Sequence, residues 1–136
     1  MPPDASDDTP YVPRILGVLN LSPESMVGES IARGDEAVAE RAAYLARTGA
    51  DWIDLGGRSI TPDAPKIGDD QEQARLEPAL ALLKGPGSER FHYRVSVDTW
   101  SPATARFALE HGADGVNYTG GALPGELLDS VAARSA

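Results

Sequence analysis

Two stretches of this 136-residue chain follow one pattern: Gly49-Ala50-Asp51-Trp52-Ile53-Asp54 and Gly112-Ala113-Asp114-Gly115-Val116-Asn117. In each, a glycine that can end a helix precedes Ala and Asp, and a short apolar run then closes on a polar side chain. The recurrence indicates an internal repeat. It decides the class of fold, because strands that alternate with helices form a parallel sheet with right-handed crossovers.

Four short apolar runs have the composition of buried strands; they span residues 15–20, 52–55, 93–98 and 115–118. Segments with helical spacing lie between and after them, at about 32–48, 70–84, 102–111 and 124–134. Gly49 is expected to end the first helix, and Ser101 to cap the third before Pro102. Pro78 removes one backbone hydrogen bond from the second helix and should kink it. The predicted fold is therefore α/β, with four βα units that make the N-terminal half of a (β/α)8 TIM barrel.

The first residues of the chain differ in composition from the rest. Residues 1–13 are rich in proline and aspartate and contain too little apolar surface to offset the entropy of ordering. We expect residues 1–13 to form a flexible N-terminal tail. Residues 14–136 are expected to form one incomplete domain of four βα units.

Charge and composition exclude several classes of function. The chain has 12 Lys+Arg against 21 Asp+Glu, a net charge of −9, which disfavours nucleic acid and anionic membranes as partners. No apolar run approaches the roughly 20 residues that cross a bilayer, so a cytoplasmic location is the default expectation. Without cysteine and with only His92 and His111, the chain offers no disulfides and no Cys/His metal cluster. We interpret both histidines as non-catalytic.

Polar side chains close all four predicted strands: Asn20, Asp54, Asp98 and Asn117. The carboxyl ends of parallel strands are where barrel enzymes bind their ligands. A single aspartate there more often starts a turn or caps a helix, but four such positions favour a site. Two buried carboxylates need hydrogen-bond donors, and a planar heterocycle with amidine-like N–H groups would supply them.

Five ordered motifs resemble dihydropteroate synthase, of the pterin-binding enzyme superfamily. Residues 15–25 (ILGVLNLSPES) are similar to its first signature, and residues 49–62 (GADWIDLGGRSITP) to its second. Residues 75–78 (RLEP), 95–99 (VSVDT) and 112–117 (GADGVN) are similar to its Arg-Val-x-Pro helix and its third and fourth strands. The resemblance runs from about Arg14 to the end of the sequence.

The resemblance implies a Mg²⁺-assisted enzyme of folate biosynthesis, a transferase that joins 6-hydroxymethyl-7,8-dihydropterin diphosphate to 4-aminobenzoate. It implies that Asp54, Asp98 and Asn117 bind the pterin, and that Asn20 helps to hold the diphosphate and Mg²⁺. The segment after Asn20 corresponds to the family's mobile lid. The diphosphate and aminobenzoate side would comprise Asn20 and the residues Ser59, Ile60, Thr61 and Pro62.

The chain departs from the family pattern at several positions. Arg58 replaces a glutamate, Ile60 and Thr61 replace a Thr-Arg pair, and Tyr118 replaces an aspartate. The lid is reduced to residues 26–28. No segment matches the motifs of the family's second half-barrel, so we expect a homo-oligomer or a second half-barrel chain, and turnover by this chain alone is in doubt.

Two other functions remain open. One is a non-catalytic pterin-binding or regulatory subunit, which the loss of the Thr-Arg pair would allow. The other is the methyltetrahydrofolate domain of a corrinoid methyltransferase, although residues 20–25 favour the synthase. The acidic residues Asp69, Asp70 and Glu72 are interpreted as favourable charges in the first turn of a helix, with no chemical role.

Overall fold

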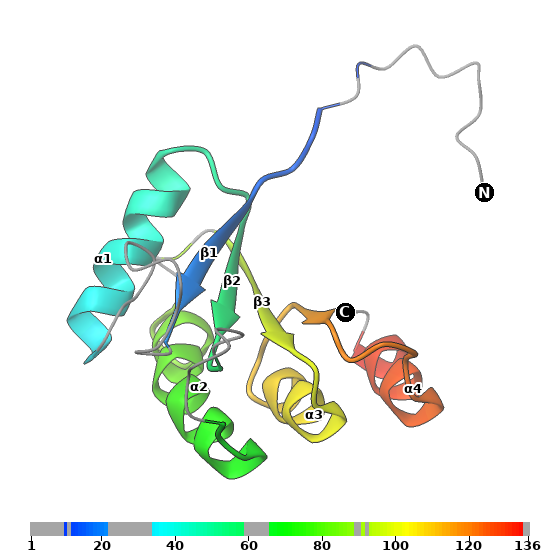
Figure 1. Cartoon of the computed structure of the whole chain (residues 1–136). Coiled ribbons are helices and arrows are strands. Elements are labelled where there is room, and N and C mark those ends of the chain that lie inside the picture. Colours follow the sequence, from blue (N-terminus) through cyan, green and yellow to red (C-terminus); the bar gives the residue numbers. More distant parts are fainter. Residues whose placement is uncertain are drawn as a thin grey trace.

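Strands and helices alternate along the chain in the order that the sequence predicts. The computed structural model describes residues 10, 12–21, 34–58, 66–88, 91 and 93–134. The strands are β1 (Leu16–Asn20), β2 (Trp52–Gly56), β3 (Arg94–Thr99) and β4 (Gly115–Tyr118). The helices are α1 (Gly34–Arg47), α2 (Asp69–Lys84), α3 (Pro102–Glu110) and α4 (Gly125–Arg134) (Figure 1). The predicted α/β class is confirmed.

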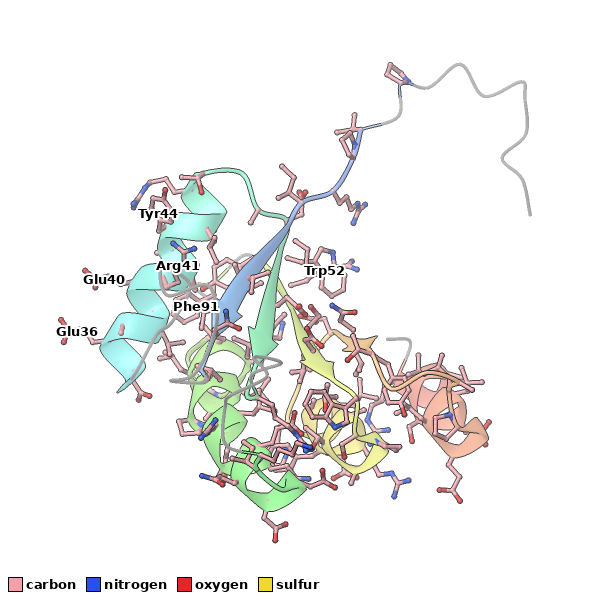
Figure 2. All side chains as sticks on the ribbon, in the orientation of Figure 1. Glu36, Glu40, Arg41, Tyr44, Trp52 and Phe91 are labelled. Carbon is pink, nitrogen blue, oxygen red and sulfur yellow. The ribbon has the colours of Figure 1, made fainter. Side chains whose placement is uncertain are left out.

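The strands form one parallel sheet in the order β1-β2-β3-β4. The helices pack against one face of the sheet, where strand residues such as Ile53, Leu55 and Val97 are fully buried with helical residues such as Leu76 and Leu80. The opposite face carries Leu16 and Val18, which are 43% and 46% exposed. We call this second face the open face. In Figure 2, Trp52 lies on the other side of β1 and β2 from α1.

The repeated Gly-Ala-Asp motif has a structural role that explains its recurrence. Gly49 and Gly112 adopt positive φ angles of 114° and 95°, a conformation that favours glycine at a helix end. Asp51 then accepts the backbone N–H of Ile15 at 2.7 Å, and Asp114 accepts that of Val95 at 2.8 Å. In both repeats the aspartate therefore pairs the start of a new strand with the start of the preceding one.

The predicted helix signals are also present. The Ser101 hydroxyl accepts a hydrogen bond from the Thr104 backbone N–H at 3.2 Å, and Pro102 begins α3. Pro78 lies inside α2, which continues through it to Lys84. In the part of the chain that the structure describes, no helix has the length and apolarity to span a bilayer. Most of the predicted tail, residues 1–9 and 11, lies outside the described residues.

The N-cap of α3 leads to a first prediction. Ser101→Ala should lower the free energy of unfolding by about 1 kcal/mol, because it leaves a backbone N–H of the first helical turn without its acceptor. Ser101→Asp should retain most of the stability, since a carboxylate caps equally well. Urea denaturation followed by circular dichroism measures both, and equal losses in the two variants would contradict the assignment.

Candidate functional site: the carboxyl edge of the open face

The register of the sheet brings the predicted strand-end side chains to one edge of the open face. Asn20 pairs with Gly56, Gly56 with Asp98, and Asp98 with Asn117, so these positions form a row across all four strands. Asp54 lies one layer below that row, where it pairs with Ser96. Asp54 therefore does not share the level of Asn20, Asp98 and Asn117. We call Asn20, Asp54, Asp98 and Asn117 the strand-end cluster.

Asp54 is the most enclosed member of the cluster, with 3% of its surface exposed. The Ser96 hydroxyl donates to its Oδ1 at 2.6 Å, and the Asn117 amide donates to its Oδ2 at 3.3 Å. Each carboxylate oxygen therefore has a donor, as the cost of burying a charge requires. The Asn117 contact spans from β4 to β2, so it joins two of the predicted site residues directly.

Asp98 is more open to solvent than Asp54. The Thr119 hydroxyl donates to its Oδ1 at 3.3 Å. Between Asp98 and Asn20 the row contains only Gly56, and a Cβ atom there would lie 3.3 Å from Asn20 Oδ1. Gly56 therefore places no side chain of β2 between Asn20 and Asp98 in this row.

The environment makes both aspartates weaker acids than usual. Burial raises the pKa of Asp54 above 3.8, although the hydrogen bonds from Ser96 and Asn117 oppose that rise. Burial also raises the pKa of Asp98, and the negative charge of Asp54 raises it further. Because burial destabilises their ionised forms, the two carboxylates would gain from hydrogen bonds donated by the N–H groups of a ligand.

This electrostatic arrangement predicts a pH-dependent effect of Asp98→Asn on stability. Because the folded protein holds the Asp98 proton more tightly than the unfolded chain, Asp98 loses stabilising influence as the pH rises through its folded pKa. The variant should therefore unfold at nearly the wild-type temperature near about pH 4 and at a higher temperature near about pH 7. Thermal melts across this pH range measure the difference, and a difference that is constant with pH would contradict it.

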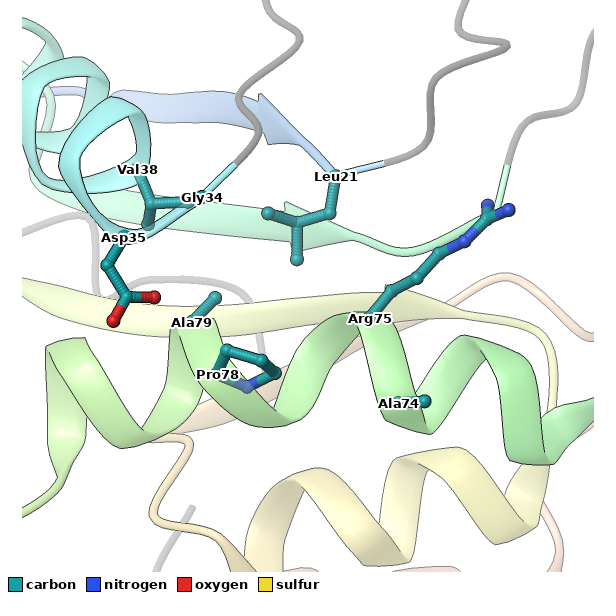
Figure 3. Close-up of a pocket in the computed structure, with 8 residues that line it drawn as sticks. All are labelled: Leu21, Gly34, Asp35, Val38, Ala74, Arg75, Pro78 and Ala79. Atoms are coloured by element: carbon teal, nitrogen blue, oxygen red, sulfur yellow. The ribbon is translucent and has the colours of Figure 1, made fainter.

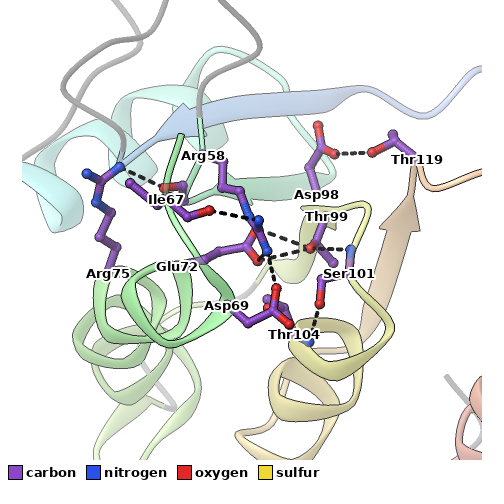
Figure 4. Close-up of polar contacts among 11 residues, drawn as sticks. Arg58, Ile67, Asp69, Glu72, Arg75, Asp98, Thr99, Ser101, Thr104 and Thr119 are labelled. Atoms are coloured by element: carbon purple, nitrogen blue, oxygen red, sulfur yellow. Dashed lines mark hydrogen bonds and ion pairs between the residues drawn. The ribbon is translucent and has the colours of Figure 1, made fainter. Parts of the chain in front are cut away.

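A charge network that includes the buried side chain of Glu72 lies behind the sheet, and the sequence analysis did not predict it. Glu72 is fully buried, and Arg58 donates to its Oε1 at 2.7 Å (Figure 4). Arg58 also pairs with Asp69, donates to the carbonyl of Ile67 at 3.1 Å, and lies 4.8 Å from the centre of the Trp100 ring. Glu72 lies in the first turn of α2, as the sequence predicts, but its side chain faces the sheet and pairs with Arg58, which the sequence analysis did not predict.

Thr99 completes this network, which we call the Arg58 network and define as Arg58, Asp69, Glu72 and Thr99. The Thr99 hydroxyl lies 3.1 Å from Glu72 Oε2 and 3.3 Å from Oε1. The sequence carried one signal for the network, because Arg58 stands where the resembled family has a glutamate. A buried arginine requires a buried acidic partner. Glu72 lies on the same face of α2 as Leu76 and Leu80, which pack against the sheet.

Two hollows flank these groups. A hollow of about 400 Å³ lies on the open face and reaches Ser96 and Asn117, which hydrogen-bond Asp54; its lining is Arg14, Ile15, Leu16, Trp52, Ser96, Gly115, Val116 and Asn117. A second, of about 250 Å³, lies between α1 and α2 (Figure 3); its lining is Leu21, Gly34, Asp35, Val38, Ala74, Arg75, Pro78 and Ala79. Only the first contains a member of the strand-end cluster.

Several predicted positions cannot be located. Ser59, Ile60, Thr61, Pro62, the shortened lid and His92 lie outside the described residues. His111 ends α3, and its ring stacks on Phe107 away from the cluster. The described residues contain no group of three or more His, Cys, Asp or Glu side chains that could together hold a metal ion.

The comparisons with known proteins define the class. Residues 16–135 match the family described as pterin binding enzyme, and the chain belongs to that family. It is 33% identical over 104 residues to the dihydropteroate synthase type-3 of Escherichia coli. The aligned residues cover 76% of this chain and 38% of that protein. The predicted membership of the pterin-binding enzyme superfamily is thereby confirmed.

Solved structures agree with this assignment. The dihydropteroate synthase of Burkholderia cenocepacia complexed with 7,8-dihydropteroate has a TM-score of 0.66 and 32% identity, over 88% of this chain and 38% of that one. The Xanthomonas albilineans enzyme with 4-aminobenzoic acid has a TM-score of 0.64 and 30% identity, over 89% and 44%. The four-stranded sheet thus corresponds to half of a (β/α)8 barrel. The chain spans about 38% of the length of the first of these relatives.

Proposed function

We propose that the strand-end cluster binds the pterin ring of a dihydropteroate synthase reaction. The observation that carries the proposal is the contact of Asp54 with Asn117, beside the raised pKa values of Asp54 and Asp98. Asp54 and Asp98 would accept hydrogen bonds from the N–H edge of the pterin, and the Asn117 amide would orient it. The relatives with bound 7,8-dihydropteroate and 4-aminobenzoic acid support this choice of ligand.

The proposed reaction joins 6-hydroxymethyl-7,8-dihydropterin diphosphate to 4-aminobenzoate. The amine nitrogen forms a bond to the methylene carbon, the carbon–oxygen bond breaks, and its electron pair leaves with diphosphate while the amine loses a proton. Asp54 and Asp98 would stabilise positive charge that develops at the methylene group. Ser59, Ile60, Thr61 and Pro62 would lie on the diphosphate and aminobenzoate side.

A magnesium ion would fit the diphosphate side of this cluster. Asn20 presents an oxygen, Oδ1, toward the space above Gly56, and an amide oxygen is a suitable ligand for a hard cation. One protein ligand suffices where phosphate oxygens and waters supply the rest. When bound, Mg²⁺ would offset the negative charge of the departing diphosphate. Asn20 itself would fix the position of that end of the substrate.

The open face suggests how the site is completed. Leu16 and Val18 are partly exposed on it, and the four described strands leave β1 and β4 paired on one side only. We expect residues 14–136 to be one incomplete domain, which a further half-barrel covers, either in a homo-oligomer or from a second chain. A cytoplasmic location would suit such an enzyme.

A non-catalytic pterin-binding subunit is the second candidate. Arg58, which could have replaced the arginine lost at Thr61, is committed to Glu72 and Asp69 and is 10% exposed. Arg58 is therefore not available as a bidentate partner for a bound anion. Diphosphate release from the completed barrel would identify an enzyme, whereas pterin binding without release would identify the binding subunit.

Fluorescence titration of 6-hydroxymethylpterin against the purified chain tests the site. We expect saturable binding that Asp98→Asn weakens by about 10- to 100-fold, the effect of a lost hydrogen bond to a charged group. Asp129→Asn is the matched control, because it removes the same charge from an exposed position of α4. Absence of binding to the folded chain, or equal effects of both substitutions, would refute the proposal.

A further inference from the structure

The strand that carries Asp98 is held from behind by its next residue. Thr99 is 1% exposed and faces the helices, whereas Asp98 faces the open side. The Thr99 hydroxyl can donate to Glu72, at 3.1 Å, and it accepts the backbone N–H of Ser101 at 3.1 Å. Its donor and its acceptor are both in use, so the side chain is fixed in one orientation.

The partner of Thr99 is itself fixed. Glu72 is fully buried on α2 and is held by the Arg58 guanidinium, which also binds the carbonyl of Ile67. Arg58 lies in the segment that follows β2 and Thr99 is the last residue of β3. The Arg58 network therefore joins the carboxyl ends of β2 and β3, the strands that carry Asp54 and Asp98, to the first turns of α2 (Figure 4).

A second connection reaches Asp98 from the other side. The carbonyl of Thr99 accepts the backbone N–H of Thr119 at 3.0 Å, and the Thr119 hydroxyl donates to the Asp98 carboxylate at 3.3 Å. The backbone of residue 99 thus affects Asp98 in two ways. It is covalently joined to Asp98, and its carbonyl positions Thr119, the hydrogen-bond donor to Asp98. Displacement of a binding group by about 1 Å is enough to lose much of its effect.

From this geometry we infer that Thr99 is a positioning residue for Asp98, and that Glu72 and Arg58 act through it. Thr99 touches no ligand, because it lies on the helix side of the sheet. The inference rests on the proposed function, since it concerns the orientation of a pterin-binding carboxylate. It assigns a role in ligand affinity to a buried network that would otherwise serve stability alone.

The test compares Thr99→Val with Thr99→Ser. Valine keeps the shape of threonine but lacks the hydroxyl, whereas serine keeps the hydroxyl. We expect Thr99→Val to weaken binding of 6-hydroxymethylpterin by about 10-fold, and Thr99→Ser to stay within about twofold of the wild type. Ser101→Ala is the control, because it weakens the same turn without touching Glu72 or Asp98. Wild-type affinity in Thr99→Val, or an equal loss in Ser101→Ala, overturns the inference.

A double-mutant cycle separates positioning from a general loss of structure. If Thr99 acts through Asp98, then Thr99→Val should cost little affinity in a chain that already carries Asp98→Asn. A full and additive loss in that background overturns the inference. If the wild type itself fails to bind pterin, the proposed function fails first, so the two failures are distinguishable.

A second variant covers the case in which Thr99→Val does not fold. The double variant Arg58→Met/Glu72→Met removes the acceptor of the Thr99 hydroxyl and replaces both buried charges with side chains of similar size. We expect it to fold, since buried ion pairs can be replaced by apolar groups. It should lose pterin affinity by about 10-fold, as for Thr99→Val. Wild-type affinity in this variant overturns the inference.

Discussion

Arg58→Met should lower the free energy of unfolding by about 3–5 kcal/mol. The substitution leaves Glu72, a fully buried carboxylate, without the guanidinium that lies 2.7 Å from its Oε1. Thr99 would remain as a donor, but one hydroxyl does not compensate a buried charge. Methionine preserves much of the volume of the arginine stem, so the loss reports on charge. Urea denaturation of the chain measures it.

The same substitution at an exposed pair provides the control. Arg106 contacts Glu126 at 3.2 Å, and the two side chains are 47% and 87% exposed, so Arg106→Met should cost less than about 1 kcal/mol. The double variant Arg58→Met/Glu72→Met should recover much of the lost stability, because no unpaired charge remains buried. Similar losses for Arg58→Met and Arg106→Met would show that Glu72 is not the cause.

Asp54→Asn should weaken pterin binding more than any other single substitution in the strand-end cluster, by about 100-fold or more. Asp54 accepts from Ser96 and from Asn117, and an asparagine offers one oxygen for two donors. Its new amide hydrogens would also oppose the N–H edge of the ligand. The substitution therefore removes an acceptor from the ligand and disturbs Asn117 as well. Pterin fluorescence titration measures the dissociation constant.

Loss of stability does not explain this expected loss of binding. Because burial raises the pKa of Asp54, the ionised carboxylate destabilises the folded protein at neutral pH, and its removal offsets the cost of the donor that asparagine leaves unpaired, so we expect little net change in stability. Asp129→Asn again serves as the control for charge. Unchanged affinity in Asp54→Asn would remove Asp54 from the binding site, and a large fall in stability would attribute the result to misfolding.

Local sequence signals were sufficient for much of the fold. The apolar runs, the Gly-Ala-Asp repeat and the Ser101-Pro102 cap predicted all eight helices and strands that the structure describes, with small shifts at their ends. These signals act over a few residues, since strand and helix periods and capping groups are properties of neighbouring positions. The strand-end polar residues could be found for the same reason.

Tertiary structure decided which of those residues meet. Asn117 reaches Asp54 across 63 positions of the sequence, and the register alone places Asp54 one layer below Asp98. Register depends on how strands pack, which no single segment encodes.

Packing between distant segments also decided the environment of Glu72. By its place in the first turn of α2 it could have faced solvent, and only packing against the sheet turned it toward Arg58 and Thr99. By itself, the sequence determined the class of fold and the chemical types at the candidate site. The partners of each buried charge emerged only when distant segments were packed together, because the cost of burying a charge is settled between residues that the chain keeps far apart.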